Sequence, residues 1–412
     1  MRGNPKSKIQ NPKPARLVQP LLAWFARNAR DLPWRRTRDP YAIWVSEIML
    51  QQTQVKTVIR YWERWMRELP MIQSVAKASP AKLHKLWEGL GYYTRVRNLQ
   101  RAAQQIIANN RRAELRDAQN NGDSRSSSLR FPENFDAILA LPGIGRYTAG
   151  AIASIAFNQP YPILDGNVIR VLTRVFGIRT NPRDRKTNTQ LWQLAGELVL
   201  HASRFTHHLS PCSHLNQSLM ELGALICTPR SPRCGVCPVK TTCVAREKNL
   251  QDQLPNLTKR EAATARRFIA FIVEHDGKFL VRQRPAGTVN AHLWEFPNFE
   301  VGARVYDPQQ LRQRKGRTNS GIHGDTEVLR LTEPRSEIIR KSRFQPNAAK
   351  PLCTIKHSIT RYRITLEAWR AELRQPRTGT DGQWRTREQL HQLAFTSAHK
   401  NILSHLDPKS PA

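Results

Sequence analysis

The sequence is poor in acidic residues, with 32 Asp and Glu against 66 Lys and Arg, which gives a formal net charge of +34. An excess of this size points to a polyanionic partner, and nucleic acid is the first candidate. A membrane surface is the alternative, but no apolar run approaches the roughly 18 residues that a spanning helix needs, and no basic amphipathic helix dominates. We therefore expect a nucleic-acid-binding chain without a membrane partner.

The sequence also lacks a secretory signal at its start, because residues 1–16 are rich in Lys and Pro and contain no apolar core. We expect a cytoplasmic, nucleoid-associated protein. Cysteine is sparse: there are six, and four of them fall within residues 227–243. In a reducing compartment such a cluster indicates a metal site rather than disulfides.

The pattern of apolar residues divides the 412 residues into an all-α half and an α+β half. The first half is rich in Trp and keeps helical spacing, with a clear helix start at Asp39-Pro40. In the second half, two apolar runs flank Asp276-Gly277 and predict a hairpin, and residues 362–368 alternate as in a half-buried strand. We expect a disordered basic tail (1–15), a helical region (16–247), a linker (248–266), an α+β domain (267–405) and polar insertions at 109–130 and 313–346.

The strongest motif is a run of cysteines with the spacing Cys-x6-Cys-x2-Cys-x5-Cys. Its members are Cys227, Cys234, Cys237 and Cys243. Four thiolates this close can converge on one site, and such ligation suits either a [4Fe–4S] cluster or a structural zinc. Zinc ribbons usually pair two Cys-x2-Cys knuckles, and this run has only one, which favours the cluster.

Three further motifs combine backbone turns with candidate catalytic carboxyls. In Leu141–Gly145, Gly143 and Gly145 let the backbone turn between two helices and approach an anion, although an ordinary turn between packed helices fits equally well. Asp165 is an N-cap for the next helix, where a carboxylate stays ionised. Glu47 has apolar helical neighbours, which raise the pKa of a carboxyl, although an exposed helical Glu also fits the periodicity.

Together these motifs resemble those of the endonuclease III superfamily of DNA repair glycosylases. The cysteine spacing resembles its iron–sulfur loop, and Leu141–Gly145 resembles its helix-hairpin-helix, which grips the DNA backbone without reading sequence. The stretch Ser46–Gln54 resembles the catalytic motif of the MutY-type adenine DNA glycosylases. The resemblance implies a [4Fe–4S] cofactor, Glu47 as the acid that protonates the leaving adenine, and Asp165 as the catalytic aspartate.

One position separates the MutY type from endonuclease III. Endonuclease III has a lysine nucleophile two residues after the last glycine of the hairpin, where this chain has Tyr147. A tyrosine cannot form a Schiff base, so strand cleavage by an amine lacks its nucleophile. The resemblance implies a monofunctional glycosylase in which Tyr147 and Asn167 orient the carboxylates and water.

The resemblance also assigns residues to base and DNA binding. The side chains implied for the adenine pocket are Arg30, Trp34, Arg35, Val55 and Gln217. Those implied for contacts with DNA or with the base opposite are Gln52, Thr53, Gly143, Gly145 and Tyr92, the last as a wedge in the base stack.

The region 267–405 resembles the MutT-like (Nudix-like) domain of MutY. It keeps Trp294–Pro297 but has no glutamate-rich box after it to bind Mg²⁺, which argues against nucleotide hydrolysis and leaves a role in lesion recognition. The family contacts the oxidised guanine with a Phe-Ser-His loop. Here Thr360 keeps a hydroxyl in place of the serine, and Arg361 replaces the histidine.

We therefore predict a monomeric, monofunctional adenine DNA glycosylase that acts on double-stranded DNA. It would flip an adenine mispaired with 8-oxoguanine or guanine out of the helix and hydrolyse its N-glycosidic bond. Two alternatives remain: an endonuclease III-type glycosylase/lyase, and a non-catalytic DNA-binding iron–sulfur protein.

Overall fold

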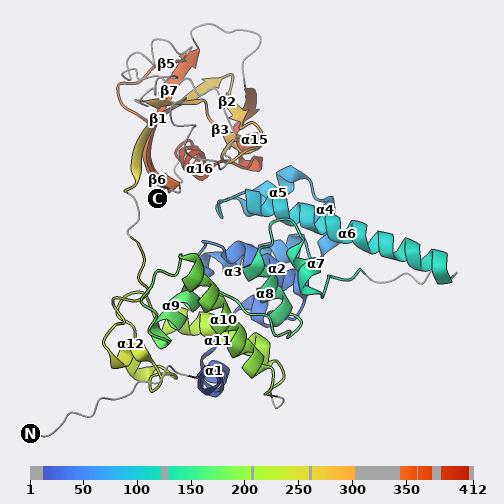
Figure 1. Ribbon diagram of the computed structural model, residues 1–412. Coiled ribbons are helices and arrows are strands. Elements are labelled where there is room, and N and C mark those ends of the chain that lie inside the picture. The colour runs from blue at the N-terminus through green and yellow to red at the C-terminus, as the bar shows by residue number, and fades with distance from the viewer. Residues whose placement is uncertain are drawn as a thin grey trace, which may run out of the picture. The chain divides into compact units, whose positions relative to one another are not determined.

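The computed structural model describes residues 13–121, 129–205, 208–258, 262–301, 344–359, 361–373 and 382–407. The chain forms two units that alternate along the sequence (Figure 1). Unit 1 comprises Met1–Lys77 and Arg97–Lys259, and unit 2 comprises Ala78–Val96 and Arg260–Ala412. Within the described ranges, no helix combines the length and the apolar character needed to span a membrane.

Unit 1 is helical, as predicted. Its elements are α1 (Ala15–Asn28), η1 (Pro33–Arg35), α2 (Pro40–Leu50), α3 (Val55–Glu68), α4 (Ile72–Lys77), α6 (Thr94–Asn121, of which the first turn lies in unit 2), α7 (Phe135–Leu139), α8 (Arg146–Ile155), α9 (Gly166–Val175), α10 (Arg185–Ala202), α11 (Pro211–Leu225), η2 (Cys234–Val236) and α12 (Val244–Glu247). The helix start at Asp39-Pro40 is confirmed, because the Asp39 carboxylate accepts a hydrogen bond from the Tyr41 N–H at 3.0 Å.

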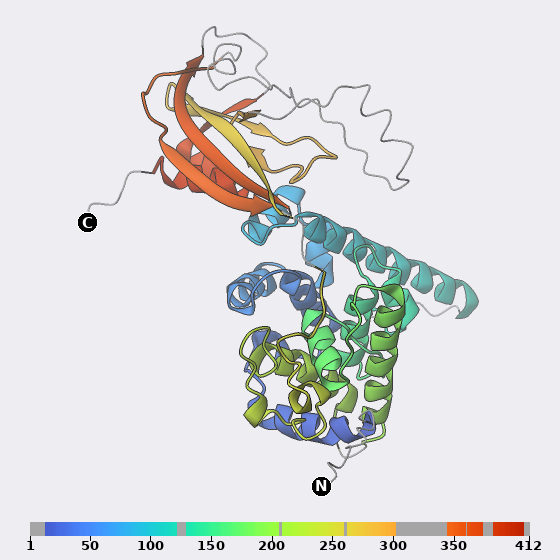
Figure 2. The same cartoon turned by 60° about the vertical axis from the view of Figure 1, so that its left-hand side comes forward.

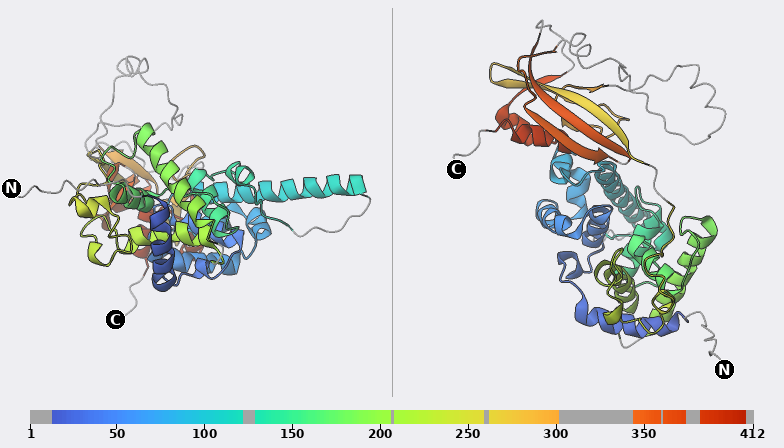
Figure 3. Two further views of the ribbon diagram at one scale, coloured as in Figure 1. Left: turned by 60° about the horizontal axis from the view of Figure 1, so that its bottom comes forward. Right: turned by 90° about the vertical axis from the view of Figure 1, so that its left-hand side faces the viewer.

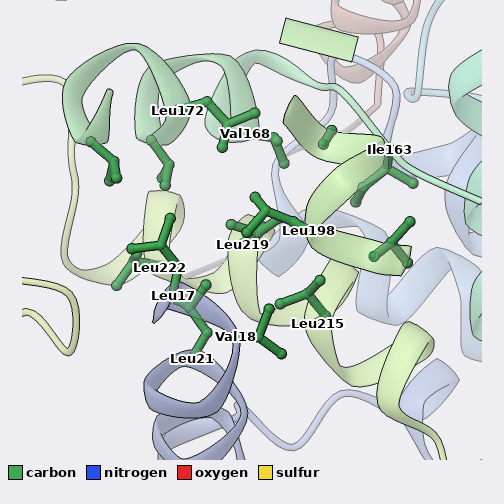
Figure 4. Close-up of a cluster of buried hydrophobic side chains, with 14 of the residues drawn as sticks. Leu17, Val18, Leu21, Ile163, Val168, Leu172, Leu198, Leu215, Leu219 and Leu222 are labelled. Carbon is green, nitrogen blue, oxygen red and sulfur yellow. The ribbon is translucent and has the colours of Figure 1, made fainter. Parts of the chain in front are cut away.

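The core of unit 1 is built around α11, which packs against α1, α8, α9 and α10. Leu17 and Leu21 of α1 and Leu215, Leu219 and Leu222 of α11 are almost fully buried, at the helical spacing that keeps apolar side chains on one face. Figure 4 shows these side chains gathered with those of the neighbouring helices. This packing fixes the position of α9, which carries Asn167 and Arg170, and of α11, which carries Gln217 and Glu221.

Helix α6 corrects one prediction. The insertion 109–130 was expected to interrupt the helical pattern, but α6 continues through Asn121 and projects from the rest of unit 1 (Figure 3). Residues 111–116 are exposed and rich in Ala, Arg, Glu and Leu, strong helix formers that extend a helix without any buried face. The Asn110 side chain accepts from the Arg130 N–H and donates to the Arg130 carbonyl, both at 3.0 Å, so the insertion closes there.

Unit 2 contains an eight-stranded sheet, with α15 and α16 against one face (Figure 2). Its elements are α5 (Pro80–Trp87), β1 (Thr264–His275), β2 (Lys278–Gln283), β3 (Trp294–Glu295), β4 (Asn298–Val301), β5 (Phe344–Pro346), β6 (Cys353–Ile359), β7 (Tyr362–Leu373), β8 (Gln383–Thr386), α15 (Arg387–Gln392) and α16 (Ser397–Ser404). The order is β3-β2-β1-β7-β5, with β4 on β1, β6 on β7 and β8 on β2. Strands β1 and β7 are parallel, with Phe268 opposite Leu366.

The two sequence signals for this sheet are confirmed. Asp276 and Gly277, at φ values of 47° and 69°, connect β1 to β2. Residues 362–368 lie in β7, where Leu366 and Ala368 are buried and Arg363 is exposed. The end of the insertion predicted at 313–346 forms β5, and its residues up to 343 lie outside the described residues. Thr360 also lies outside them.

The expected boundaries are corrected at three points. Helix α1 begins at Ala15, inside the expected tail 1–15, and β1 begins at Thr264, inside the expected linker 248–266. The first part of that linker is packed, because Leu250 and Leu254 bury their side chains beside Ala245. The segment Ala78–Val96, expected in the helical region, belongs to unit 2.

Candidate active site and iron–sulfur centre

Glu47 and Tyr147 form the centre of the candidate site. Glu47, on α2, is only 5% exposed, and its Oε2 accepts a hydrogen bond from the Tyr147 hydroxyl at 2.9 Å. Burial raises the pKa of Glu47 to about 7, and the charge of Asp165 adds to this rise, whereas the hydrogen bond from Tyr147 opposes it. A carboxyl with this pKa holds a proton for part of the time at neutral pH, as a general acid must.

Asp165 is the N-cap of α9. Its Oδ1 accepts from the Val168 N–H at 2.7 Å and its Oδ2 accepts from the Asn167 amide at 3.0 Å. Burial raises the pKa of Asp165 above its ordinary value, while these hydrogen bonds act in the opposite direction. The helix N-terminus alone predicted a carboxyl that ionises readily, so burial is the contribution that the sequence missed.

Arg170 is a site residue that the sequence analysis missed. It is 9% exposed, and its guanidinium donates to Asn167 Oδ1 at 2.8 Å, to the Cys227 carbonyl at 2.7 Å and to the Gly223 carbonyl at 2.7 Å. A Cβ on Gly223 would stand 2.6 Å from the Cβ of Asn167, so only glycine lets α11 approach this close. Arg170 thus connects the asparagine that holds Asp165 to the first residue of the cysteine loop.

The turn of the predicted helix-hairpin-helix, Leu141–Gly145, lies between α7 and α8. Gly143 has φ +78°, and a Cβ there would stand 2.6 Å from the Cβ of Asn98, so both its backbone and its surroundings require glycine. Gly145 is the N-cap of α8, and the next residue, Arg146, stacks its guanidinium on Trp192 at 4.0 Å. The turn therefore presents a helix N-terminus and a cation together, which suits a phosphate.

Two of the residues expected in the adenine pocket, Arg30 and Arg35, converge on a buried carboxylate, Glu221, and a third, Gln217, binds Arg35. Arg30 donates to Glu221 through Nε and Nη2 at 2.7 and 2.8 Å, and Arg35 donates through Nη2 at 2.9 Å. Arg35 also donates to Gln217 Oε1 at 3.0 Å. Although burial alone would raise it, the hydrogen bonds from the two arginines lower the pKa of Glu221 to about 2.

The remaining N-terminal site residues lie on η1, at the start of α3 and in the turn between α2 and α3. Trp34 is 6% exposed and packs edge-on against Trp62, with ring centroids 6.1 Å apart. Val55 is the first residue of α3 and is half-buried. Gln52 is exposed at φ 58°, and Thr53 is half-buried in the same turn. Their expected contacts with adenine and with the opposite base stay predictions.

Two of the site residues that the structure describes lie in unit 2. Tyr92 is 46% exposed and has φ 47°, in the left-handed region. Arg361 is exposed at the start of β7, where its guanidinium lies 5.3 Å from the centre of the Tyr362 ring and donates to the Tyr362 hydroxyl at 3.1 Å. The guanidinium of Arg266 lies 4.8 Å from the centre of the same ring and pairs with the buried carboxylate of Glu300, so Arg361 is the exposed cation at this end of the β6–β7 hairpin.

The four clustered cysteines line one cavity at the end of unit 1. All six cysteines of the chain are free thiols, and this cavity is bounded by Cys227, Cys234, Cys237 and Cys243 together with apolar residues of α9 and α11. Burial, with a smaller contribution from the neighbouring cysteines, raises the pKa of the Cys237 thiol to about 12. Thiols in this position need a bound cation to become thiolate ligands.

The loop around this cavity is held by a second arginine that the sequence analysis missed. Arg174, on α9, is 2% exposed and lies with Nη1 3.4 Å from the Cys227 sulfur. It donates to the carbonyls of Thr228 at 2.7 Å and Leu254 at 2.9 Å. In the described residues, no three His, Cys, Asp or Glu side chains are arranged to hold a single metal ion, and the cavity shared by four sulfurs has the donor set of an iron–sulfur centre.

Three stretches of the chain match known families. Residues 45–197 match the HhH-GPD superfamily of base excision DNA repair proteins, residues 227–243 match the iron-sulfur binding domain of endonuclease III, and residues 268–405 match the NUDIX domain. The fold and the site therefore define a helix-hairpin-helix base excision repair protein with an iron–sulfur centre and a Nudix-like domain.

Curated relatives narrow this class. The adenine DNA glycosylase of Homo sapiens is 32% identical, over 93% of this chain and 72% of that protein. That of Buchnera aphidicola subsp. Acyrthosiphon pisum is 35% identical, over 68% of this chain and 74% of that protein. The Arabidopsis thaliana adenine DNA glycosylase is 36% identical, over 68% of this chain, which spans 46% of that protein's length. This chain belongs to the adenine DNA glycosylase family.

Proposed function

We propose that this protein removes adenine that is mispaired with 8-oxoguanine or guanine in double-stranded DNA, by hydrolysis of the N-glycosidic bond. The observation that carries this proposal is the buried carboxyl of Glu47, with a pKa of about 7, held by Tyr147 within electrostatic reach of Asp165. Membership of the family supports the same reaction. DNA is the partner, and the formal charge of +34 favours its binding.

Each step of the reaction uses one of these groups. Glu47 donates its proton to a ring nitrogen of the extruded adenine, and the electron pair of the glycosidic bond leaves with the base. Asp165 stabilises the oxocarbenium-like sugar that results. Water adds to the sugar carbon and returns a proton to Glu47, which leaves an abasic site. Tyr147 and Asn167 keep the two carboxyls in place during these steps.

We also propose that the iron–sulfur group is a [4Fe–4S] cluster. The four cysteines would hold it, and it would supply a rigid scaffold for the loop. The expected preparation is brown, absorbs near roughly 400 nm and contains about four irons per chain. A colourless protein with one zinc per chain would contradict this assignment. Cys234→Ser should reduce folding or DNA affinity more than the rate of the chemical step.

The function is tested by single-turnover base release from duplexes that contain A:8-oxoguanine, A:G or thymine glycol. We expect adenine release from the first two, and an abasic product that breaks only after alkali. Glu47→Gln should keep mispair binding and lose base release by at least roughly 10²–10⁴-fold. Release of thymine glycol with spontaneous strand cleavage would favour the glycosylase/lyase, and binding without release would favour the non-catalytic alternative.

Lesion recognition is assigned to the β6–β7 connection, where Thr360 and Arg361 stand at the positions that the resemblance gives to Ser and His. The exposed guanidinium of Arg361, beside Tyr362, places positive charge at this hairpin. If Arg361 reads the lesion, Arg361→Ala weakens binding of the A:8-oxoguanine duplex only. If Arg361 instead contacts a DNA phosphate, Arg361→Ala weakens binding of the A:G duplex and of the A:8-oxoguanine duplex equally. We also propose that the protein acts as a monomer, in the cytoplasm, on nucleoid DNA.

A further inference from the structure

The residues that carry Tyr92 are held by the C-terminal part of the chain. Unit 2 combines Ala78–Val96 with the C-terminal sheet. Within that segment α5 leads directly into the loop Glu88–Tyr92, which we name the tyrosine loop. Lys85 of α5 and Glu88 of this loop form hydrogen bonds within unit 2 to residues more than 300 positions later in the sequence.

Glu88, the first residue of the tyrosine loop, is the centre of these contacts. It is 4% exposed, and its Oε1 accepts a hydrogen bond from the Phe395 N–H at 2.9 Å. Its Oε2 accepts from Lys400 Nζ at 2.6 Å and lies 3.2 Å from Lys85 Nζ. Charge-assisted hydrogen bonds of this kind are short and strong, so they fix the position of the first loop residue.

Helix α5 makes two more contacts within unit 2. Lys85 Nζ donates to the Leu393 carbonyl at 2.9 Å. The ring of His84, which is 4% exposed, stacks on His292 with ring centroids 6.3 Å apart and an angle of 14° between the planes. The helix before the tyrosine loop is therefore attached both to the segment 393–400 and to the connection between β2 and β3.

The tyrosine loop itself has little freedom to absorb a displacement. Gly89 and Gly91 have φ values of 105° and 70°, and Tyr92 has φ 47°, which a tyrosine rarely adopts. The Gly91 carbonyl accepts hydrogen bonds from Trp87 Nε1 and Arg95 Nη2, both at 3.1 Å. The residue before Glu88 is thus hydrogen-bonded to the residue before Tyr92, which joins the two ends of the tyrosine loop directly.

We propose that the Glu88–Lys400 ion pair positions Tyr92 against DNA, and that Lys400 is a positioning residue for base release. This inference rests on the proposed function, in which Tyr92 wedges into the base stack beside the lesion. It gives the C-terminal domain a second way to influence the reaction, separate from the hairpin that carries Arg361. The ring of Tyr92 would contact DNA, whereas Lys400 would act only through Glu88.

A double-mutant cycle in the full-length protein tests the proposal. Wild type, Lys400→Ala, Tyr92→Ala and the double variant are compared by single-turnover adenine release from an A:8-oxoguanine duplex. A second readout is the fluorescence of 2-aminopurine placed next to the 8-oxoguanine, which rises when a wedge unstacks it. Lys400→Ala should lower the rate roughly three- to tenfold, as expected for loss of one charge-assisted hydrogen bond, and reduce the fluorescence rise. In the Tyr92→Ala background it should change neither readout.

Two controls separate positioning from folding. Lys400→Arg keeps the charge and should restore both readouts. Arg267→Ala removes an exposed ion pair with Glu367 at 2.9 Å on the sheet of the same unit, and should leave both readouts unchanged. Lys400 is itself 50% exposed, but Lys400→Ala also takes one partner from the buried Glu88 carboxylate. The unfolding temperature of every variant is therefore measured, and all rates are compared at a temperature at which each variant is fully folded.

The outcomes distinguish this proposal from the proposed function. Additive effects of Lys400→Ala and Tyr92→Ala, or a normal fluorescence rise in Lys400→Ala, overturn the positioning role and leave the glycosylase assignment intact. A Tyr92→Ala protein with normal rate and fluorescence overturns both the positioning role and the assignment of Tyr92 as a wedge. Absence of adenine release in wild type overturns the proposed function itself.

Discussion

The guanidinium of Arg170 donates through Nη2 to Asn167 at 2.8 Å and through Nε to the backbone carbonyl of Cys227 at 2.7 Å. Asn167 in turn donates to Asp165 at 3.0 Å. A loop that holds the iron–sulfur group is therefore joined to the proposed catalytic aspartate through one side chain and one amide. The cysteine loop can influence catalysis by this route without any electron transfer.

Arg170→Gln should weaken both stability and activity. The shorter side chain leaves the buried Cys227 and Gly223 carbonyls without their donor, which should lower the free energy of unfolding by about 2–4 kcal/mol. It also frees Asn167, so the single-turnover rate of base release should fall roughly tenfold as Asp165 loses its fixed orientation. Arg185→Gln, at an exposed position on α10, is the matched control. Equal stability and rate in the two variants would contradict the bridging role.

The pH dependence of base release should report the Glu47–Tyr147 pair. Glu47 acts in its protonated form, so the rate should fall as the pH rises through its pKa of about 7. The Tyr147 hydroxyl donates to the charged carboxylate and thereby lowers this pKa. Tyr147→Phe removes that donor, so the midpoint should move to higher pH, by on the order of one unit. Single-turnover rates between about pH 5.5 and 9 measure the shift across the range in which this carboxyl titrates, and a midpoint that moves to lower pH would exclude the hydrogen bond as its cause.

The proposed catalytic groups could be predicted from the sequence because each belongs to a short motif. Glu47, Asp165 and the cysteines stand within a few residues of the features that mark them. The three charged residues that support them could not be predicted in this way. Arg170, Arg174 and Glu221 each have partners 53 to 191 positions away, and only tertiary packing brings these together. That these charged residues are buried and support the site can be seen only from the packed arrangement of the helices.

The fold was predictable to a similar degree. Capping residues and the Asp276-Gly277 turn gave correct element starts, since these signals act locally. The extension of α6 was missed because its residues 111–116 are all exposed, which leaves no apolar period to detect in that stretch. The assignment of residues 78–96 to unit 2 was missed because it depends on contacts such as that between Glu88 and Lys400.

Glu221→Gln should destabilise the protein in a pH-dependent manner. The carboxyl pKa is lowered from 4.5 to about 2 in the folded state, so its contribution to stability is complete above about pH 4.5 and is lost as the pH falls through 2. At neutral pH the variant should lose about 3 kcal/mol, because Arg30 and Arg35 lose a buried partner. Urea unfolding at several pH values measures this loss. Glu197→Gln, at an exposed position on α10, is the control, and a Glu221→Gln deficit that persists undiminished at about pH 2 would exclude ionisation as its origin.

Two truncated chains should differ in their iron content. A chain that ends at Thr258 keeps Leu250 and Leu254, which pack beside Ala245, and keeps the Leu254 carbonyl that accepts from Arg174 at 2.9 Å. A chain that ends at Lys248 loses both contacts next to the cysteine loop. We expect the longer chain to retain about four irons and its absorbance near roughly 400 nm, and the shorter chain to lose a large part of both.

Iron analysis and thermal unfolding of the two purified chains make this comparison directly, because neither contains the C-terminal sheet and they differ only in the ten residues 249–258. The lost packing alone, from two leucines that are 7% and 4% exposed, should lower stability by about 3–5 kcal/mol. Equal iron content and equal unfolding temperatures would mean that α12 and the cysteine loop stabilise this end of the helical unit without residues 249–258. In that case the hydrogen bond from Arg174 to Leu254 would hold the start of the connection to the sheet without contributing to the iron–sulfur centre.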